Sequence, residues 1–474
     1  MTNIHKKSFS GSMQLLTRQI IVQSFNLIGG IVLARLLSVN EYGFYGIVTY
    51  LFSLIMNFGD IGFFAGMVNK QEEPSIIEYR SVFSSQAVLV LFSTSIFVML
   101  TPWICSKYKL PSNYSLYLYL IALSFIASVG KTIPAAKLER NLDYKWLSVI
   151  EIGQSFLFNG SAIILAFFHC GPLSFCLAFL IRTLSGSILI SIVQPWDFRP
   201  YFKWAIIKSY LNYGLPLQLS TFINLGKDAI SPIIIGLLLG ISQSGIVNMA
   251  CTIAGLPTML LFILNRLYFS AFSRALNDKI TLESIFSNGI IVSNTIVAVL
   301  SMFFLIMVDP IIIHIFGPKW MASKSLFYFI WTINLTMPTM MVCLTFINAH
   351  GKSKINIFYS TVWMLITLGL GTPLIMKWGI IGFGIANCVV NFSMVMVYFK
   401  AREHTQVNIF TTLFKAWCPA LIASLSLILY RFFCPQTSLV GLIAVFTVYI
   451  LIAAPMYLLL YKDRLIAIKK LIYA

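Results

Sequence analysis

Long apolar runs separated by short polar stretches repeat along the whole chain. Each run holds about 20 residues, enough for a helix that rises about 1.5 Å per residue to cross roughly 30 Å of hydrocarbon. The runs are continuous and do not alternate, so they predict helices rather than the strands of a β-barrel. No stretch between them is long enough for a globular domain. The fourteen predicted spans cover residues 13–36, 43–68, 81–104, 114–136, 147–168, 172–194, 210–238, 245–265, 286–308, 325–347, 357–376, 379–399, 416–431 and 437–461.

Composition indicates an integral membrane protein. Of the 474 residues, 58% are hydrophobic and only 10% are charged, whereas a soluble domain carries about 25% charged residues. The net charge of +18 would suggest a nucleic-acid partner in a soluble protein. Here the basic residues are spread over short loops without forming a clustered basic face, so we expect no nucleic-acid partner. The eight cysteines form neither a CxxC pair nor a Cys/His cluster, so we expect no metal site and no cofactor.

The charges of the loops predict the topology. With the N-terminus in the cytoplasm, 22 of the 33 Lys and Arg residues fall on the cytoplasmic side, 7 fall on the opposite side and 4 lie within spans. Because Lys and Arg accumulate in cytoplasmic loops, this distribution favours a multi-pass chain with both termini inside. The basic tail at residues 462–470 is expected to bind the anionic lipid surface.

One segment pair suggests an internal repeat. Ile31–Gly43 is similar to Ile233–Gly245 at an offset of 202 residues, with matching apolar positions and coinciding glycines at the end. Six predicted spans separate the copies, so they have the same orientation, and parallel repeats of this kind build two halves around a site at the membrane midplane. Chance similarity between apolar segments is the alternative.

The predicted fold is therefore an all-α integral membrane protein of about fourteen helices, arranged in two pseudo-repeated lobes around a central cleft. Spans one to six form an N-terminal lobe (residues 1–200) and spans seven to twelve a C-terminal lobe (residues 201–400). Residues 401–474 supply two extra spans and the basic cytoplasmic tail.

Charged residues inside the spans are the first candidates for function, since a charge at the bilayer centre costs about 2.5–3.5 kcal/mol on insertion scales. Arg182 is the strongest candidate, because it lies near the middle of the sixth span and cannot easily reach an interface. In a hydrated cleft it could pair with phosphate oxygens. Alternatively, it is a structural partner of a buried acid or of carbonyl groups. Arg18 and Lys131 lie nearer the ends of their spans, where they either attract an anionic head group or extend to the interface.

Two polar stripes at helical spacing could line the cleft. The stripe of the seventh span consists of Thr221, Asn224, Asp228 and Ser231, and that of the first span of Gln19, Gln23 and Asn26. The offset of 202 residues relates Gln19 to Thr221 and Asn26 to Asp228, so the stripes could face a common cavity. Hydrogen bonding between neighbouring helices is an equally good explanation. Lys227 is a further candidate cleft cation that could bind phosphate oxygens. It adjoins Asp228, and we expect the two not to form a facing pair because neighbours on a helix point in different directions.

Two further acids lie within predicted spans, Asp60 in the second and Glu151 in the fifth. Each could neutralise one of the cations or couple transport to H⁺ or Na⁺. We favour the ion-pair role, since an acid beside a cation stays charged without further coupling. Asp309, at the edge of the ninth span, is expected at the interface.

Five segments resemble, in order, the Wzx-type polysaccharide flippases of the multidrug/oligosaccharidyl-lipid/polysaccharide (MOP) exporter superfamily. Leu33–Tyr45 is similar to the family's "LARLLSPEEFGLY" turn and Asp228–Gly240 to its "DKLLIGRLLG". Phe269–Asp278 resembles "FPALSRLQDD", Phe316–Trp320 resembles "GpkW" and Gly379–Ala386 resembles "yGaiGaAiA".

The chain also departs from the family pattern. Ser270 stands where the family often has Pro, and Ala229 and Leu237 replace basic residues, so a substrate contact after Asp228 cannot be transferred.

The resemblance implies a two-lobe transporter with alternating access, not an enzyme. It implies export of undecaprenyl-diphosphate-linked oligosaccharide across the bacterial inner membrane for O-antigen, capsule or exopolysaccharide, with polysaccharide polymerase and chain-length proteins as further partners. The alternatives are a peptidoglycan-precursor flippase or a cation-coupled drug antiporter of the same superfamily. A membrane polysaccharide polymerase is disfavoured, because no DxD motif or carboxylate-rich loop occurs.

Overall fold

The structure is a computed structural model that describes the backbone of residues 2–434 and 438–473. Side chains are described over these ranges except at residues 2–13, 16, 213, 216, 217, 220 and 462–473, so the predicted role of the basic tail lies outside the described residues. Every regular element in the described ranges is a helix, as predicted. The chain divides into two compact units, unit 1 (Met1–Gly245) and unit 2 (Ile246–Ala474).

The described part of unit 1 contains nine longer helices and three short elements, and the boundary between the units lies within α11. These elements are α1 (Thr2–Leu36), α2 (Val39–Asp60), α3 (Phe63–Asn69), α4 (Ile76–Lys107), α5 (Tyr114–Ser128), η1 (Val129–Lys131), α6 (Thr132–Arg140), α7 (Tyr144–Phe167), α8 (Leu173–Val193), α9 (Trp204–Asp228), η2 (Ile230–Ile235), α10 (Gly236–Leu239) and α11 (Ile241–Gly255).

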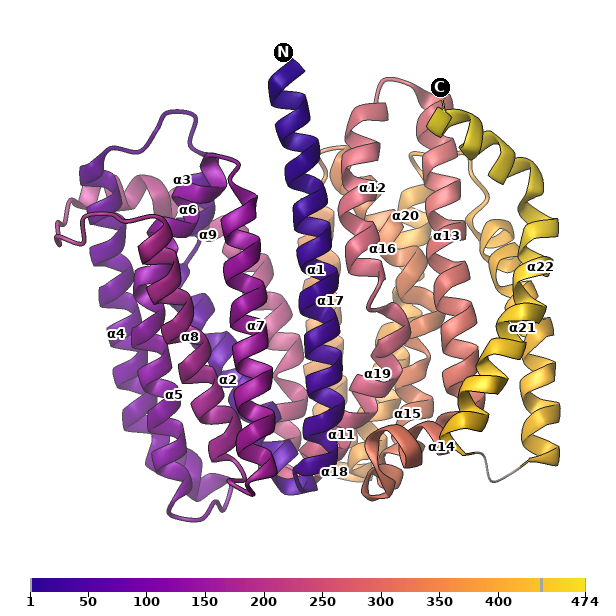
Figure 1. The fold of residues 1–474 in the computed structure, drawn as a ribbon, viewed down its shortest axis with the longest axis horizontal. Coiled ribbons are helices and arrows are strands. Elements are labelled where there is room, and N and C mark those ends of the chain that lie inside the picture. The colour runs from indigo at the N-terminus through magenta and orange to yellow at the C-terminus, as the bar shows by residue number, and fades with distance from the viewer. Residues whose placement is uncertain (1, 435–437, 474) are drawn as a thin grey trace. The chain divides into compact units, whose positions relative to one another are not determined.

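Unit 2 is likewise helical, and its elements follow α11 in chain order (Figure 1). They are η3 (Leu256–Thr258), α12 (Leu261–Ala275), α13 (Lys279–Ile306), α14 (Val308–Ile311), η4 (Ile312–Phe316), η5 (Pro318–Ser323), α15 (Lys324–Trp331), α16 (Ile333–Ala349), α17 (Lys354–Leu365), η6 (Ile366–Leu370), α18 (Gly371–Trp378), α19 (Ile380–Ser393), α20 (Met396–Arg402), α21 (Ile409–Phe433) and α22 (Leu439–Tyr473). The division into lobes at 1–200, 201–400 and 401–474 remains a prediction. The two compact units are defined by packing, whereas the predicted lobes are defined by a repeat in the sequence.

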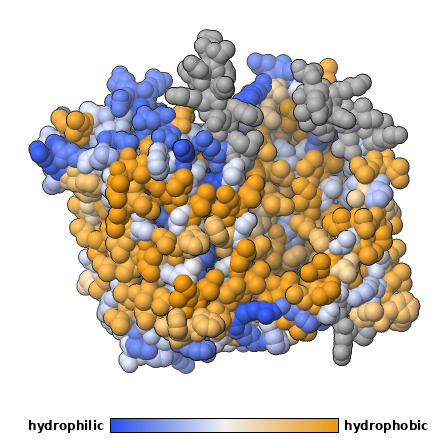
Figure 2. All heavy atoms as spheres, in the orientation of Figure 1, coloured by the Kyte–Doolittle hydropathy of each residue, from blue (hydrophilic) through white to orange (hydrophobic). Residues whose placement is uncertain are grey.

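Eleven helices in the described residues are long and apolar enough to cross a membrane, and three bent helix pairs raise the number to 14 if each pair is one span. The predicted count is confirmed on that reading. The bends are 50° between α2 and α3, 44° before α12 and 43° before α16. At the first bend, Ile61 and Gly62 adopt a positive φ, which ends the right-handed helix. Figure 2 shows hydrophobic side chains over most of the visible face of the helices and hydrophilic side chains mainly near their ends.

The segments of the predicted repeat meet within unit 1. Ser38 and Glu41 cap α2 reciprocally, the side chain of each accepting from the backbone N–H of the other. Close to this cap, a Cβ added to Gly43 would lie 2.1 Å from the carbonyl oxygen of Ile241. A Cβ added to Gly245 would lie 2.5 Å from the carbonyl oxygen of Val39. The coinciding glycines therefore let the two segments approach at backbone distance.

Hydrogen bonds of polar side chains join helices within each unit. In unit 1 the Arg140 guanidinium donates to the carbonyl oxygens of Met67, Val68 and Lys70 at 2.7, 3.2 and 2.6 Å, which holds the end of α3 against α6. In unit 2 the Asn294 amide donates to Thr339 at 2.8 Å and accepts from Trp417 at 3.1 Å, which joins α13, α16 and α21.

Asp309 of α14 joins three elements of unit 2. Its carboxylate forms ion pairs with Lys324, at 2.7 Å, and with Arg431. Burial would raise the pKa of Asp309, but the hydrogen bond with Lys324 and the charge of Arg431 outweigh it, so the pKa lies below its usual range. Asp309 is therefore an ion-paired anchor for α15 and α21.

Candidate functional site

Three cations that the sequence singled out lie together in unit 1, beside α7. Helix α7 packs against both α1 and α8 (Figure 1). Arg18 comes from α1, Lys131 from the short element η1 and Arg182 from the middle of α8. We call these three residues, together with Glu151 of α7, the cationic cluster.

Each cation of the cluster has its own partner on α7. Arg18 forms an ion pair with Glu151, with 3.0 Å between Nη1 and Oε2. Lys131 donates through Nζ to the side-chain oxygen of Gln154 at 3.0 Å. The Arg182 guanidinium carbon lies 5.7 Å from the ring centroid of Phe158, a cation–π distance. These partners stand at positions i, i+3 and i+7 of α7, so one face of the helix carries all three.

The cluster has an excess of positive charge. Three cations and one carboxylate give a net charge of +2, and in the described part of the chain Glu151 is the acid that forms an ion pair there. The charge of Glu151 also acts on Lys131 and Arg182, which places the four groups within electrostatic reach of one another. Uncompensated cations in a low-dielectric region are costly, so this arrangement is suited to binding an anion.

The cluster is closed on one side and open on the other. The Arg18 side chain is 12% exposed and Gln154 is 4% exposed, whereas the Glu151 side chain is 40% exposed and Arg182 is exposed. Arg182 lies 11 positions before the end of α8, or about 16 Å along the helix axis. A cation exposed to lipid at that depth would be unfavourable, so we expect water or an anion next to it.

Two glycines make room for the polar face of α7. A Cβ added to Gly186 of α8 would lie 1.3 Å from the amide nitrogen of Gln154, and one added to Gly29 of α1 would lie 1.9 Å from the amide oxygen of Asn159. Sequence reasoning missed Gln154, Phe158 and both glycines. The available signal was the series of polar residues at helical spacing on the fifth span.

Asn26 takes part in hydrogen bonds between helices. Its side-chain oxygen accepts from Ser155 Oγ at 3.1 Å and from Asn159 Nδ2 at 3.2 Å, which joins α1 to α7. This geometry agrees with the structural explanation of the first polar stripe at Asn26. Gln19 and Gln23 are half-buried on the same helix, and their role stays a prediction.

The second polar stripe follows α9 only as far as Asp228. Asn224 and Asp228 are exposed and Thr221 is half-buried, but Ser231 is buried because the π-helix η2 changes the rotation of the chain after Ala229. The expectation that Lys227 and Asp228 do not pair is wrong. Their side-chain nitrogen and oxygen are 3.7 Å apart, since a long lysine side chain can fold back towards its neighbour. Lys227 thus pairs locally, outside the cationic cluster.

Asp60 pairs with backbone rather than with a cation. Its carboxylate accepts from the backbone N–H of Phe64 at 3.0 Å, at the bend before α3. No ion pair of Asp60 occurs in the described part of the chain. The ion-pair interpretation therefore fits Glu151, while the Asp60 carboxylate accepts from a backbone N–H in the first turn of α3.

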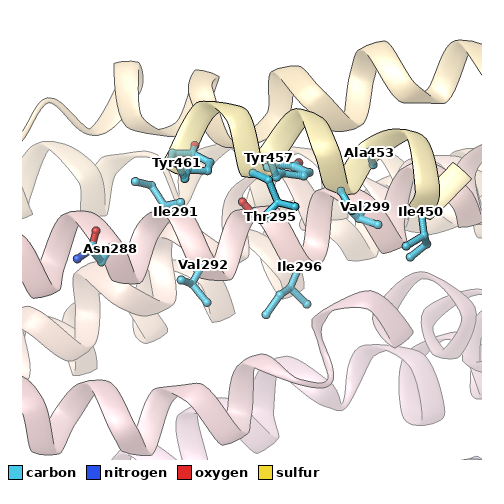
Figure 3. Close-up of a pocket in the computed structure, with 12 residues that line it drawn as sticks. Asn288, Ile291, Val292, Thr295, Ile296, Val299, Ile450, Ala453, Tyr457 and Tyr461 are labelled. Atoms are coloured by element: carbon cyan, nitrogen blue, oxygen red, sulfur yellow. The ribbon is translucent and has the colours of Figure 1, made fainter. Parts of the chain in front are cut away.

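Unit 2 contains an apolar groove of about 450 Å³ between α13 and α22. Figure 3 shows Tyr457 and Tyr461 of α22 beside Ile291 and Thr295 of α13. The lining has the chemistry to hold a hydrocarbon chain and too few polar groups to hold a sugar. It consists of Asn288, Ile291, Val292, Thr295, Ile296, Val299, Ile450, Ala453, Ala454, Tyr457, Leu458 and Tyr461. In the described residues no group of three or more His, Cys, Asp or Glu side chains could hold a metal ion.

Comparison with solved structures shows which proteins share this fold. The lipid II flippase MurJ, in an inward closed conformation, matches with a TM-score of 0.70 and 14% identity, over 98% of this chain and 100% of that chain. An inward-facing multidrug resistance MATE family transporter of the MOP superfamily matches with a TM-score of 0.64 and 15% identity, over 83% of this chain and 98% of that chain. The protein is thus a multi-pass membrane protein with the MOP-superfamily fold, as the sequence predicted.

The family follows from the sequence itself. A family described as polysaccharide biosynthesis protein matches residues 32–325, which is more than half of the chain, and the chain belongs to this family. The comparison with curated proteins finds no match. The predicted resemblance is confirmed at the level of the fold and of the polysaccharide biosynthesis protein family.

Proposed function

We propose that the protein is a flippase that moves undecaprenyl-diphosphate-linked oligosaccharide across the bacterial inner membrane for surface polysaccharide synthesis. Membership of the polysaccharide biosynthesis protein family supports the pathway, and the fold shared with a lipid II flippase supports the type of cargo. The observation that carries the proposal is the cationic cluster, because its net charge of +2 matches the chemistry of a diphosphate.

The proposed topology brings the cluster towards the leaflet where the substrate is made. With both termini in the cytoplasm, α7 starts on the cytoplasmic side, and Glu151 lies about 10 Å along the helix from Tyr144. A diphosphate entering from the cytoplasmic leaflet would therefore meet Arg18 and Lys131 before Arg182. Guanidinium groups suit this role, since they bind phosphate oxygens through two parallel hydrogen bonds.

Other polar residues are proposed for the glycan and for coupling. The hydroxyl groups of the sugars need hydrogen-bonding partners inside the membrane, and Gln19, Gln23, Thr221 and Asn224 are candidates on α1 and α9. Asp228, exposed within a span, is a candidate for coupling to H⁺ or Na⁺ during alternating access. Glu151 and Asp60 remain weaker candidates for coupling, since each already has a structural partner. Polymerase and chain-length proteins remain proposed partners.

A peptidoglycan-precursor flippase is the second candidate, favoured by the match to MurJ along nearly the whole chain. It carries the same diphosphate, so the cluster suits both substrates. A drug antiporter fits less well, because a cluster of net positive charge would repel a cationic drug.

Arg182→Gln tests the proposal in cells that lack the native gene. We expect the variant to insert normally but to lose surface polysaccharide, because the diphosphate loses a cation at mid-span. Arg199→Gln is the matched control, since Arg199 lies in the loop before α9 with a side chain that is 80% exposed. Lipid-linked oligosaccharide should accumulate in the cytoplasmic leaflet of the deletion strain. Normal surface glycan with Arg182→Gln would contradict the role of this residue, and loss of peptidoglycan synthesis instead would favour the second candidate.

A further inference from the structure

We infer that Gln154 and Phe158 are positioning residues that hold Lys131 and Arg182 in place without neutralising them. The inference rests on the proposed function for the identity of the ligand, a diphosphate. The structure supplies the rest, because each cation contacts one side chain of α7 and only one of the three partners, Glu151, is charged.

Because Gln154 and Phe158 are uncharged, the charges of Lys131 and Arg182 remain available to a ligand. A carboxylate at position 154 would form an ion pair with Lys131, and the net charge of the cluster would fall from +2 to +1. The amide of Gln154 fixes the ammonium by a hydrogen bond of 3.0 Å and leaves its charge intact. The ring of Phe158 does the same for Arg182 through its π face.

The spacing of the partners suits an anion with two adjacent phosphate groups. Gln154 and Phe158 are four residues apart, so their positions on α7 differ by about one helical turn, or about 6 Å along the axis. Their cations come from different elements, Lys131 from η1 and Arg182 from α8. A diphosphate can contact two such cations at once, whereas a single phosphate has fewer oxygens to share between them.

The amide of Gln154 is buried in close contact with α8. Gln154 is 4% exposed, and its amide nitrogen lies where a side chain on Gly186 would be. The packing of α7 on α8 therefore confines the amide while its oxygen accepts from Lys131. Gly186 thus contributes indirectly, by leaving space for the positioning residue.

The test uses the purified full-length protein in lipid nanodiscs, with inorganic pyrophosphate and inorganic phosphate as probes. Gln154→Glu keeps the size of the side chain and adds a charge, so we expect pyrophosphate to bind at least about tenfold more weakly while the thermal midpoint is unchanged or higher. Gln194→Glu, at the end of α8, adds the same charge outside the cluster and should bind pyrophosphate like the wild type. If Gln154 had only a structural role, Gln154→Glu would lower the thermal midpoint of the protein. The ratio of its affinities for pyrophosphate and phosphate would then stay as in the wild type.

A second pair of variants decides the question if Gln154→Glu does not fold. Phe158→Leu removes the ring beneath Arg182, and we expect severalfold weaker pyrophosphate binding, with recovery in Phe158→Tyr. Wild-type affinity in both Gln154→Glu and Phe158→Leu would overturn the inference. If Arg182→Gln alone abolishes binding, the positioning roles are wrong while the proposed function stands. If Arg182→Gln also binds normally, the diphosphate site itself is wrong.

Discussion

At the scale of single residues, the cationic cluster combines the charges of Arg18, Lys131, Arg182 and Glu151 with the uncharged side chains of Gln154 and Phe158. Arg18, Arg182 and Glu151 are recognisable because charges within apolar runs are rare. Their partners are ordinary residues such as Gln154 and Phe158, whose roles depend on the packing of α7 against its neighbours. The side-chain conformation of Lys227 was likewise unpredictable, since a flexible chain can reach an adjacent acid.

Residue chemistry also predicts a pH response in unit 2. Lys352 donates to the Nε2 atom of His404 at 2.6 Å, and the ring of His350 lies 5.6 Å from that of His404. Burial, followed by the charges of Lys352 and His350, lowers the pKa of His404. The folded state then binds this proton less readily than the unfolded state, whose value is about 6.5.

We therefore expect the contribution of His404 to the free energy of unfolding to be fully present above about pH 6.5. This contribution should fall as the pH drops from there through the lower pKa that His404 has in the folded state. Thermal midpoints of the full-length protein at pH 7.5 and 5.5 check this. The wild type should lose more than His404→Gln, which cannot take up the proton. Equal losses in the two proteins would show that His404 does not carry the effect.

At the scale of elements, the apolar runs predicted the helices well, because the length and continuity of each run can be read directly from the sequence. The breaks within them were less predictable. The bend at Ile61 and Gly62, the π-helix η2 and the hydrogen bond from Phe64 to Asp60 depend on local backbone geometry. The polar face of α7 was visible as a pattern, but its meaning required knowing that Gly29 and Gly186 lie against it.

Gly186→Ala tests the packing of α8 on α7. The added methyl group would displace the amide at the flexible end of Gln154, while alanine favours the helix over glycine, so we expect a small net loss of stability of about 1 kcal/mol. Thermal unfolding of the purified protein measures it. Gly160→Ala on α7 is the matched control, because no atom lies within 4 Å of its added Cβ and alanine favours a helix over glycine. Equal stability of the Gly186→Ala and Gly160→Ala variants would contradict the close packing of α8 on α7 at Gly186.

At the scale of the whole molecule, composition and periodicity predicted an all-helical membrane protein, and the fold and family confirm it. The charge of the loops adds a topology that can be measured. Lys352, between α16 and α17, is predicted on the cytoplasmic side, and Lys319, in η5, on the opposite side. The substrate could not be read from hydropathy, because related exporters share a fold while their sites differ.

Labelling of single cysteines tests this topology. In a variant without native cysteines, Lys319→Cys should react with a membrane-impermeant maleimide added to cells whose outer membrane is permeabilised. Lys352→Cys should react only after the inner membrane is opened. Reaction of both positions from the same side would contradict the proposed orientation of the spans.

The most direct test of the central claim is transport in reconstituted vesicles that contain undecaprenyl-diphosphate-linked oligosaccharide. The account predicts that the wild-type protein moves the lipid-linked oligosaccharide between leaflets, that Arg182→Gln does not, and that Arg199→Gln does. Absence of movement with the wild type, or equal movement with Arg182→Gln, would contradict it.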